Sequence, residues 1–391
     1  MKIESIQATP VRIDFTEPEI WSQGRRFGAT CIIVQVRTDT EIIGIGESVP
    51  APDPYVTLAA IEMAARRLVG RDPRAINQLC LDLQYLDGWC SFPYVGHGAL
   101  AGVEIACWDI AGKILGAPVH DLLGGKIRSR VPIMGFVQHK GPDEIETDAR
   151  AMAAQGYTTL YTKLGLGMED DVEAVEALRR GGGPKVELRV DPNESWTPGH
   201  AIRMAHAIAH LGVQYIEQPL RMRSIHELAV LRRRSPVPIG ANQASWLNWD
   251  ILDIVREKAA DVIMTDPWQA GGIGNFQRAA AICETASLPM VYHSFAPLSI
   301  ATRAAMTVLC SSSACIYANQ TYHHMTADDV VREPVQIIDG HIEVIDRPGL
   351  GVEVDHDKLA RYHEAFLSGG YASAYGNVDK TSSETFFIPN Q

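Results

Sequence analysis

The chain is poor in cysteine and has no long apolar run. Seven cysteines are scattered over 391 residues without a Cys-x-x-Cys pair. An odd number without metal-ligand spacing favours buried thiols in a reducing compartment. No apolar run reaches membrane-spanning length, and the N-terminus lacks the apolar core of a signal peptide. These absences argue against a secreted or membrane protein, and we expect a cytoplasmic one.

Basic clusters are also missing. The 35 lysines and arginines are outnumbered by 47 acidic residues, which gives a formal net charge of −12. No lysine- or arginine-rich block stands out, so nucleic acid and anionic membranes are poor partners. A small molecule is the better expectation.

Strands followed by helices are predicted for the first third of the chain. Apolar residues alternate with polar ones over much of 1–50, which predicts antiparallel strands. The period then becomes helical from Pro54 to about Leu115. We therefore expect an α+β domain over 1–125, completed by the C-terminal segment at about 351–391.

A long loop is expected at 16–30, between the first two strands. It carries aromatic and cationic side chains, among them Trp21 and Arg25. Loops of this kind are often lids, so we expect these two residues to close over a substrate. A mobile hairpin loop without a function is the competing interpretation.

Strands and helices alternate from Val131 onward. This alternation predicts an α/β domain over 126–350, a (β/α)8-type barrel. The expected strands lie near 131–138, 159–163, 186–191, 214–217, 237–242, 261–266, 289–293 and 314–319. The expected helices lie near 144–155, 169–180, 199–211, 225–234, 249–258, 275–286 and 298–309. Two further short strands are expected within 334–350.

Polar residues recur at the ends of the middle strands of this series. Asp191, Glu217, Asn242, Asp266 and His293 follow one another at intervals of 24–27 residues, each after a short apolar run. Such a period suits one strand plus one helix. It places these side chains at the carboxyl ends of the strands, where barrel enzymes keep their chemistry.

Several motifs occur in a characteristic order over nearly the whole chain. They lie at 102–113, 122–125, 189–193, 215–219, 266–273 and 349–355. In this order they resemble the enolase superfamily, specifically the mandelate racemase and muconate lactonizing enzyme group. The resemblance implies a barrel with an α+β capping domain built from the N-terminal region and the C-terminal segment. It also implies that a divalent metal, usually Mg²⁺, holds a substrate carboxylate while a base removes the α-proton.

The resemblance makes Asp191 and Glu217 the first two metal ligands, with Asn193 as a neighbouring polar contact to substrate. A strand-end carboxylate can also simply cap the next helix, which is the structural alternative. The third ligand departs from the family, because Asn242 and Gln243 stand where an acid is expected. An amide oxygen can bind Mg²⁺ but brings no charge, so metal affinity should fall. A weak site, a site completed by substrate and loss of the metal all remain open.

The second strand carries Tyr161 and Lys163 where the family commonly has two lysines. Lys163 matches the lysine that acts as base on one face of the substrate, and a strand-end ion pair is its structural alternative. Tyr161 could donate a hydrogen bond or act as an acid. His293 and Asp266 match the His–Asp pair of the mandelate racemase subgroup, the closest branch.

The eighth strand lacks the glutamate electrophile of that subgroup, and Asn319 or Gln320 could replace it as a hydrogen-bond donor to substrate. The leading hypothesis is a dehydratase (a hydro-lyase) of a hydroxy or sugar acid. A racemase, epimerase or cycloisomerase of a small carboxylic acid is the second. A metal-independent enzyme or a non-catalytic relative that binds a small acid is the third. A symmetric homo-oligomer is expected, as is common for barrel enzymes.

Overall fold

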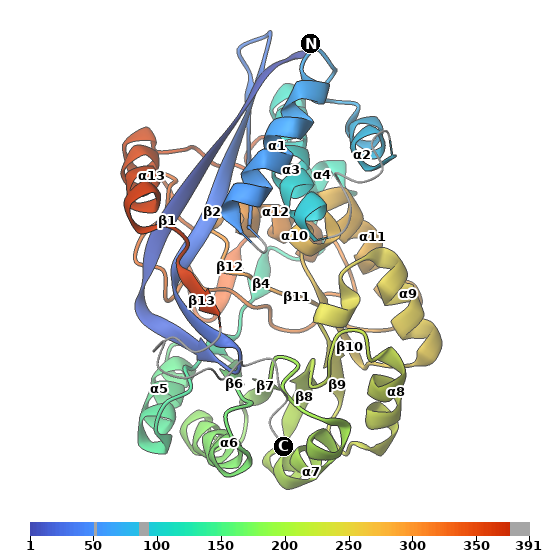
Figure 1. Ribbon diagram of the computed structural model, residues 1–391, viewed down its shortest axis with the longest axis vertical. Helices are drawn as coiled ribbons and strands as arrows, with labels where there is room; N and C mark the ends of the chain where they lie inside the picture. Colours follow the sequence, from blue (N-terminus) through green and yellow to red (C-terminus); the bar gives the residue numbers. More distant parts are fainter. Residues whose placement is uncertain (51–52, 86–93, 376–391) are drawn as a thin grey trace.

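The computed structural model describes residues 1–50, 53–85 and 94–375, and it has two parts (Figure 1). The first is an antiparallel sheet covered by helices. Its strands are β1 (Ile3–Trp21), β2 (Gly24–Thr38) and β3 (Ile43–Ser48), and its helices are α1 (Pro54–Leu68), α2 (Ile76–Tyr85), α3 (Val95–Leu115) and α4 (Val119–Leu122). β2 pairs with β1 and β3 in antiparallel register, as the alternation of residues 1–50 predicted.

Local sequence explains the position of these helices. Asp53 caps α1, since its side chain accepts hydrogen bonds from the backbone N–H groups of Tyr55 and Val56. Helix α3 packs closely on β3 because both carry glycine at the contact. A Cβ atom on Gly46 would lie 1.9 Å from the carbonyl oxygen of Gly102. The absence of side chains therefore lets the helix and the strand meet backbone to backbone.

The C-terminal elements return to this first part. β13 (Ser373–Tyr375) pairs antiparallel with β2, and α13 (His356–Gly369) packs against β1 (Figure 1). These contacts agree with a capping domain that includes the C-terminal segment, although residues 376–391 lie outside the described chain. The domain boundary at residue 125 stays a prediction.

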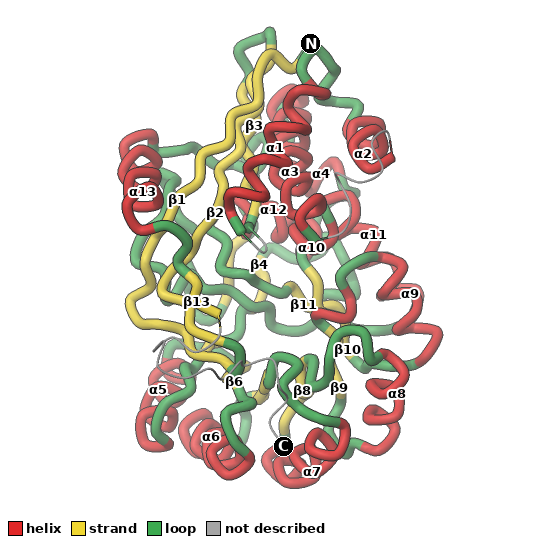
Figure 2. The backbone as a smooth tube through the Cα atoms, in the orientation of Figure 1, coloured by secondary structure: helices red, strands yellow, loops and turns green. Residues whose placement is uncertain are grey.

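The second part is a curled parallel sheet with helices on its outer side (Figure 2). Its seven strands follow chain order and alternate with helices, as in a barrel. The strands are β5 (Gly135–Phe136), β6 (Thr159–Lys163), β7 (Glu187–Asp191), β8 (Val213–Glu217), β9 (Ile239–Ala241), β10 (Val262–Thr265) and β11 (Met290–Tyr292). The helices are α5 (Pro142–Ala154), α6 (Met168–Gly182), α7 (Pro198–Ile208), α8 (Ile225–Arg234), α9 (Asn248–Glu257), α10 (Pro267–Ala270), α11 (Ile273–Thr285) and α12 (Ser299–Leu309).

The expected eighth strand is an extended segment rather than a regular strand. Met290 N–H donates to the Ala314 carbonyl on one side, and Asn319 N–H donates to the Pro132 carbonyl on the other. The segment 314–320 thus bridges the two edges of the sheet. The barrel closes here through isolated hydrogen bonds. The apolar run predicted a strand, but the segment does not form the continuous hydrogen-bond ladder of one.

Two other expectations need correction. The expected first strand at 131–138 is split into β4 (Arg130–Pro132) and β5, and β4 pairs antiparallel with β12 (His341–Glu343). β12 is the one strand that the described chain forms within 334–350. The expected loop at 16–30 is wrong as well, because β1 and β2 run through it and leave only Ser22 and Gln23 as the turn.

Over residues 1–50, 53–85 and 94–375, none of the helices has the length and apolar character that crossing a membrane requires.

Candidate active site

Neighbouring strands bring two carboxylates together at one end of the barrel. Asp191 ends β7 and Glu217 ends β8, and these strands are hydrogen-bonded to each other in parallel. Both side chains are fully buried. Buried carboxylates this close raise each other's energy unless cations or donors compensate them, so their partners matter.

Asp191 is surrounded by donors. Its Oδ2 accepts hydrogen bonds from the hydroxyl of Tyr161 at 2.7 Å and from Nζ of Lys163 at 2.8 Å. Tyr161 and Lys163 lie two residues apart on β6, so both point to the same face of the strand. The Oδ1 atom accepts from the backbone N–H of Asn193 at 2.7 Å. Burial raises the pKa of Tyr161 well above its usual value, so this residue stays a donor.

Glu217 is less well satisfied. Its Oε1 accepts from Nδ2 of Asn242 at 2.6 Å, while Oε2 is buried and makes no hydrogen bond in the described chain. Burial, with the nearby charge of Asp191, raises the pKa of Glu217 well above its usual range. A buried carboxylate oxygen without a hydrogen-bond partner is a natural ligand for a cation. The donor set of Asp191 and Glu217 is hard oxygen, which fits a divalent ion such as Mg²⁺.

The third position of this centre is an amide. Asn242 follows β9, and its Oδ1 accepts a hydrogen bond from Nε2 of Gln269 at 3.3 Å. Gln243, the second amide expected as a ligand, begins a short 3-10 turn, and its Oε1 is buried without a hydrogen-bond partner in the described chain. Across residues 1–50, 53–85 and 94–375, no group of three or more His, Cys, Asp or Glu side chains has metal-binding geometry. Among the described residues, Asp191 and Glu217 are therefore the carboxylates available for an ion, and the amides of Asn242 and Gln243 are the neutral candidates.

A histidine–aspartate pair lies on the next two strands. His293 Nδ1 is 2.9 Å from Oδ2 of Asp266, and both side chains are nearly buried. Asp266 also caps α10, because its Oδ1 accepts from the backbone N–H of Gln269 at 2.7 Å. With Nδ1 engaged by Asp266, the imidazole is held in one orientation and Nε2 is the atom available for proton transfer. The predicted pairing of these residues is thus present in the geometry.

The β1–β2 hairpin reaches from the first part of the molecule to these strand ends (Figure 1). At its turn, Ser22 Oγ donates to the Pro192 carbonyl at 2.8 Å, and Gln23 Nε2 donates to the Asn193 carbonyl at 2.6 Å. Asn193 adopts φ +48°, and its buried Oδ1 makes no hydrogen bond in the described chain. The hairpin therefore closes over the motif that follows Asp191, and Asn193 lies beneath it.

The hairpin also places an arginine near the site, and it is not the arginine that the sequence indicated. Trp21 is buried, but Arg25, the arginine expected over the substrate, is exposed, and Arg26 is buried instead. Adjacent residues of a strand point to opposite faces, so only one of the two arginines can face inward. The guanidinium of Arg26 lies over the rings of Trp21, Phe295 and Tyr322, with its Cζ 5.1–5.6 Å from their centroids.

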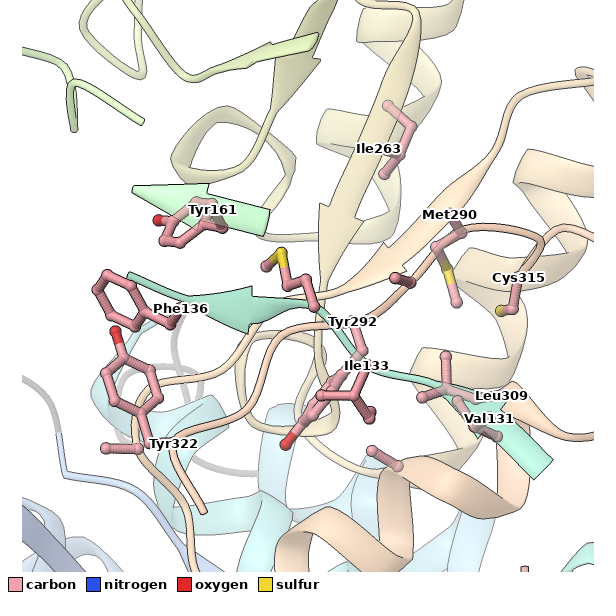
Figure 3. Close-up of a cluster of buried hydrophobic side chains, with 14 of the residues drawn as sticks. Val131, Ile133, Phe136, Tyr161, Ile263, Met290, Tyr292, Leu309, Cys315 and Tyr322 are labelled. Carbon is pink, nitrogen blue, oxygen red and sulfur yellow. The ribbon is translucent and has the colours of Figure 1, made fainter. Parts of the chain in front are cut away.

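Glu19 is a site residue that sequence reasoning missed. It is buried, and its Oε1 accepts from the hydroxyl of Tyr322 at 2.8 Å and lies 3.9 Å from Nζ of Lys163. Its Oε2 lies 3.4 Å from Nη1 of Arg26. Tyr322 and Tyr161 both pack edge-on against Phe136, which joins this end of the hairpin to the barrel interior (Figure 3). Residues two apart on a strand share a face, so an inward-facing Trp21 would have indicated that Glu19 faces inward as well.

Asn319 serves the backbone rather than the site. Its Oδ1 accepts from the Tyr292 N–H at 2.8 Å, and its Nδ2 donates to the carbonyls of Pro132 and Tyr317. These bonds help to close the barrel, so geometry gives no support to Asn319 as a substrate contact. Gln320 is the better donor, since its Nε2 is buried and makes no hydrogen bond within the described residues.

The family assignment rests on matches over most of the chain. Residues 5–124 match the mandelate racemase / muconate lactonizing enzyme N-terminal domain, and residues 144–358 match the enolase C-terminal domain-like family. The N-succinyl-L-Arg/Lys racemase of Bacillus cereus is 27% identical over 92% of this chain and 97% of its own length. The arabinonate dehydratase of Saccharolobus solfataricus is 24% identical over 85% of this chain and 90% of its own length.

Solved structures agree. A crystal structure of an enolase from Streptomyces coelicolor has a TM-score of 0.86 and 31% identity, and covers 95% of this chain and 99% of that one. A dipeptide epimerase from Enterococcus faecalis, complexed with Mg and a dipeptide, has a TM-score of 0.84 and 25% identity over 90% of this chain and all of that one. Other relatives are cycloisomerases and further sugar acid dehydratases. The chain therefore belongs to the enolase superfamily, in its mandelate racemase and muconate lactonizing enzyme group.

Proposed function

We propose that this enzyme removes the α-proton of a hydroxylated carboxylate and then expels a β-hydroxyl as water. The observation that carries the proposal is the position of two proton-transfer groups around the carboxylate centre. Lys163 contacts Asp191 from β6, and the His293–Asp266 pair stands on β11 and β10. Because the barrel places β6 and β11 on different sides of Asp191 and Glu217, a substrate held between them would meet a group on each face.

The cofactor in this proposal is Mg²⁺. Members of the superfamily generally use it, and the E. faecalis epimerase structure contains Mg. Asp191 and Glu217 would hold the ion, with Asn242 as a neutral third ligand. A bound divalent ion supplies the positive charge that an α-carbanion of a carboxylate needs. The partnerless Oε2 atom of Glu217 supports this assignment.

The chain's own residues divide the proton transfers. Lys163 would take the α-proton on Nζ, and its contact with Asp191 holds its amine in place. His293 would donate a proton from Nε2 to the departing β-hydroxyl, which then leaves as water. Asp266 would hold the imidazole in the required tautomer through its 2.9 Å contact with Nδ1. Tyr161 would donate to Asp191 and keep that carboxylate oriented.

Racemisation or epimerisation is the second candidate, because the same two groups can exchange a proton across one carbon. The racemase and dipeptide epimerase relatives favour it. The two reactions separate in deuterated water. Dehydration yields a keto acid, whereas racemisation incorporates deuterium at the α-carbon and keeps the hydroxyl.

The first experiment is Mg²⁺ titration calorimetry of the chelator-stripped protein, with Asp191→Asn as control, followed by a screen of sugar acids for keto-acid formation. Binding that disappears in the control, followed by keto-acid formation, supports the proposal. Failure of the wild type to bind Mg²⁺ would instead support a metal-independent or purely binding role. The homo-oligomer and the cytoplasmic location stay predictions.

A further inference from the structure

The hairpin sets a charged pair between the two proton-transfer groups. Glu19 lies 3.9 Å from Nζ of Lys163, and Arg26 stacks on Phe295, whose ring lies 5.2 Å from that of His293. Glu19 and Arg26 are themselves 3.4 Å apart, and both are buried. The pair thus lies near Lys163 at one end and, through Phe295, near His293 at the other.

Each basic side chain of the site lies close to an acidic side chain. Lys163 is 2.8 Å from Asp191, His293 is 2.9 Å from Asp266, and Arg26 is 3.4 Å from Glu19. A first carboxylate on the substrate would meet the divalent ion. A second carboxylate would have to take Arg26 from Glu19, which would then keep only Nζ of Lys163, 3.9 Å away, as a cationic neighbour. Separating a buried ion pair in this way is costly.

A hydroxyl group would meet the same pair on better terms. The Oε2 atom of Glu19 is buried and makes no hydrogen bond in the described chain, so it can accept one. The neighbouring guanidinium can donate. A hydroxyl both donates and accepts, and it leaves the ion pair intact. Buried polar groups that are built to bond a hydroxyl also reject ligands that cannot satisfy them.

We propose that the Glu19–Arg26 pair selects a monocarboxylate with an uncharged, hydroxylated tail and rejects the corresponding dicarboxylate. This inference rests on the proposed function, since it concerns the far end of the same substrate. The expected substrate class is therefore the aldonic acids and not the aldaric acids. Glu19 is the element of discrimination, because its negative charge both neutralises Arg26 and repels a second carboxylate.

The test uses pairs of sugar acids that differ only at the terminal carbon. D-gluconate and D-glucarate form one pair, and D-galactonate and D-galactarate form another. Binding to the Mg²⁺-loaded full chain is measured by calorimetry, so the result does not depend on turnover. Of the two aldonates, the one that binds more tightly should bind at least about tenfold more tightly than the aldarate of the same pair. A difference of this size is typical of an unpaired buried charge.

The variant Glu19→Gln keeps the shape of the side chain but leaves the Arg26 charge uncompensated. We expect it to shift the aldonate-to-aldarate ratio by about tenfold or more toward the aldarate. Glu17→Gln is the matched control, because it removes a negative charge two residues away that pairs with Lys140 on the surface. The control should keep the wild-type ratio. Arg26→Lys, which retains the cation, should also keep the preference for the aldonate.

Other outcomes overturn the inference. A wild type that binds aldarates as well as aldonates, or a ratio unchanged by Glu19→Gln, means that the pair only braces the hairpin. Thermal unfolding identifies a Glu19→Gln protein that fails to fold, and the aldonate-to-aldarate ratio of the wild type then decides. Mg²⁺ binding and keto-acid formation that persist without selectivity would leave the proposed function standing and refute this inference alone. A chain that binds neither Mg²⁺ nor any of the four acids refutes both.

Discussion

The site has two halves, a floor of strand-end side chains and a roof formed by the β1–β2 hairpin. The floor holds Lys163, Asp191, Glu217, Asn242, Asp266 and His293, each at or just after the end of a strand. The roof holds Glu19, Trp21 and Arg26, which depend on the direction that each residue of a hairpin faces. A barrel fixes the floor through its period, whereas one residue of register decides the roof. Chemistry should therefore reside in the floor and substrate choice in the roof.

The largest effect expected is loss of proton transfer from the floor. Lys163→Met removes the amine that contacts Asp191 but keeps the length of the side chain. We expect turnover to fall by about a thousandfold, within the range usual for a general base. His293→Gln should fall similarly in dehydration. The measurement is keto-acid formation under saturating Mg²⁺, and near-normal turnover in either variant would remove that residue from the mechanism.

The roof variant Glu19→Gln tests whether the roof matters for the rate as much as the floor does. Glu17→Gln, on the exposed part of β1, provides the baseline for a charge change that leaves the site alone. The comparison between floor and roof holds only if the roof variant Glu19→Gln alters substrate preference more than the maximal rate on the preferred acid. A thousandfold loss of rate in Glu19→Gln would instead place Glu19 among the groups that act on the reacting atoms.

The sequence predicted the floor better than the roof, for a physical reason. Strand-end positions such as Asp191 and His293 follow from a repeat of 24–27 residues, which survives an error of one or two residues at an element boundary. The choice between Arg25 and Arg26 does not survive such an error, because a shift of one residue turns the side chain to the other face. Expecting a loop at 16–30 discarded that alternation altogether.

The extended segment 314–320 illustrates the same limit in the barrel. Its apolar residues predicted a strand, but the strand's hydrogen-bond ladder depends on neighbours far away in the chain, including Pro132 and Tyr292. Proline cannot donate to a ladder, so Pro132 offers only its carbonyl to Asn319. Periodicity carries no information about such partners. The consequence for the site was the assignment of Asn319, whose amide is occupied by backbone groups.

The second-largest effect concerns the metal. Asp191→Asn removes one of the two charges that the floor offers an ion, and we expect Mg²⁺ affinity to fall by about a hundredfold, as for loss of a hard anionic ligand. Calorimetry on chelator-stripped protein measures it. The roof variant Glu19→Gln, in which both ligand carboxylates remain, should bind Mg²⁺ within a few-fold of wild type. Equal losses in the two variants would deny the separation of floor from roof.

A smaller effect in the opposite direction is expected at Asn242. In the described structure its amide group donates to Glu217, and its oxygen accepts from Gln269. Asn242→Asp supplies a third carboxylate in nearly the same volume, so Mg²⁺ should bind about tenfold more tightly. The same variant without metal should be less stable, because three buried carboxylates then repel one another. Tighter binding together with a lower unfolding temperature in chelator is the expected signature.

An unchanged Mg²⁺ affinity in Asn242→Asp would show how many protein ligands the ion has. If Asn242→Asp binds Mg²⁺ no better than wild type, the side chain at position 242 does not reach the ion, and the site has two protein ligands. Gln243→Glu is the matched comparison, because it adds the charge on the neighbouring amide, whose Oε1 is buried without a hydrogen-bond partner in the described chain. Tighter Mg²⁺ binding in that variant alone would make Gln243 the third ligand instead of Asn242.

The smallest effect expected lies at the hairpin turn. Gln23→Ala removes the 2.6 Å hydrogen bond from Nε2 to the Asn193 carbonyl, one of the two side-chain bonds that tie the turn to the barrel. A single hydrogen bond of this kind contributes about 1 kcal/mol, so the closed hairpin should be populated several-fold less. We expect KM to rise several-fold with little change in kcat, because the floor that performs the chemistry is untouched. A fall in kcat with unchanged KM would mean that the roof positions the reacting groups, and the division of labour between the two halves would fail.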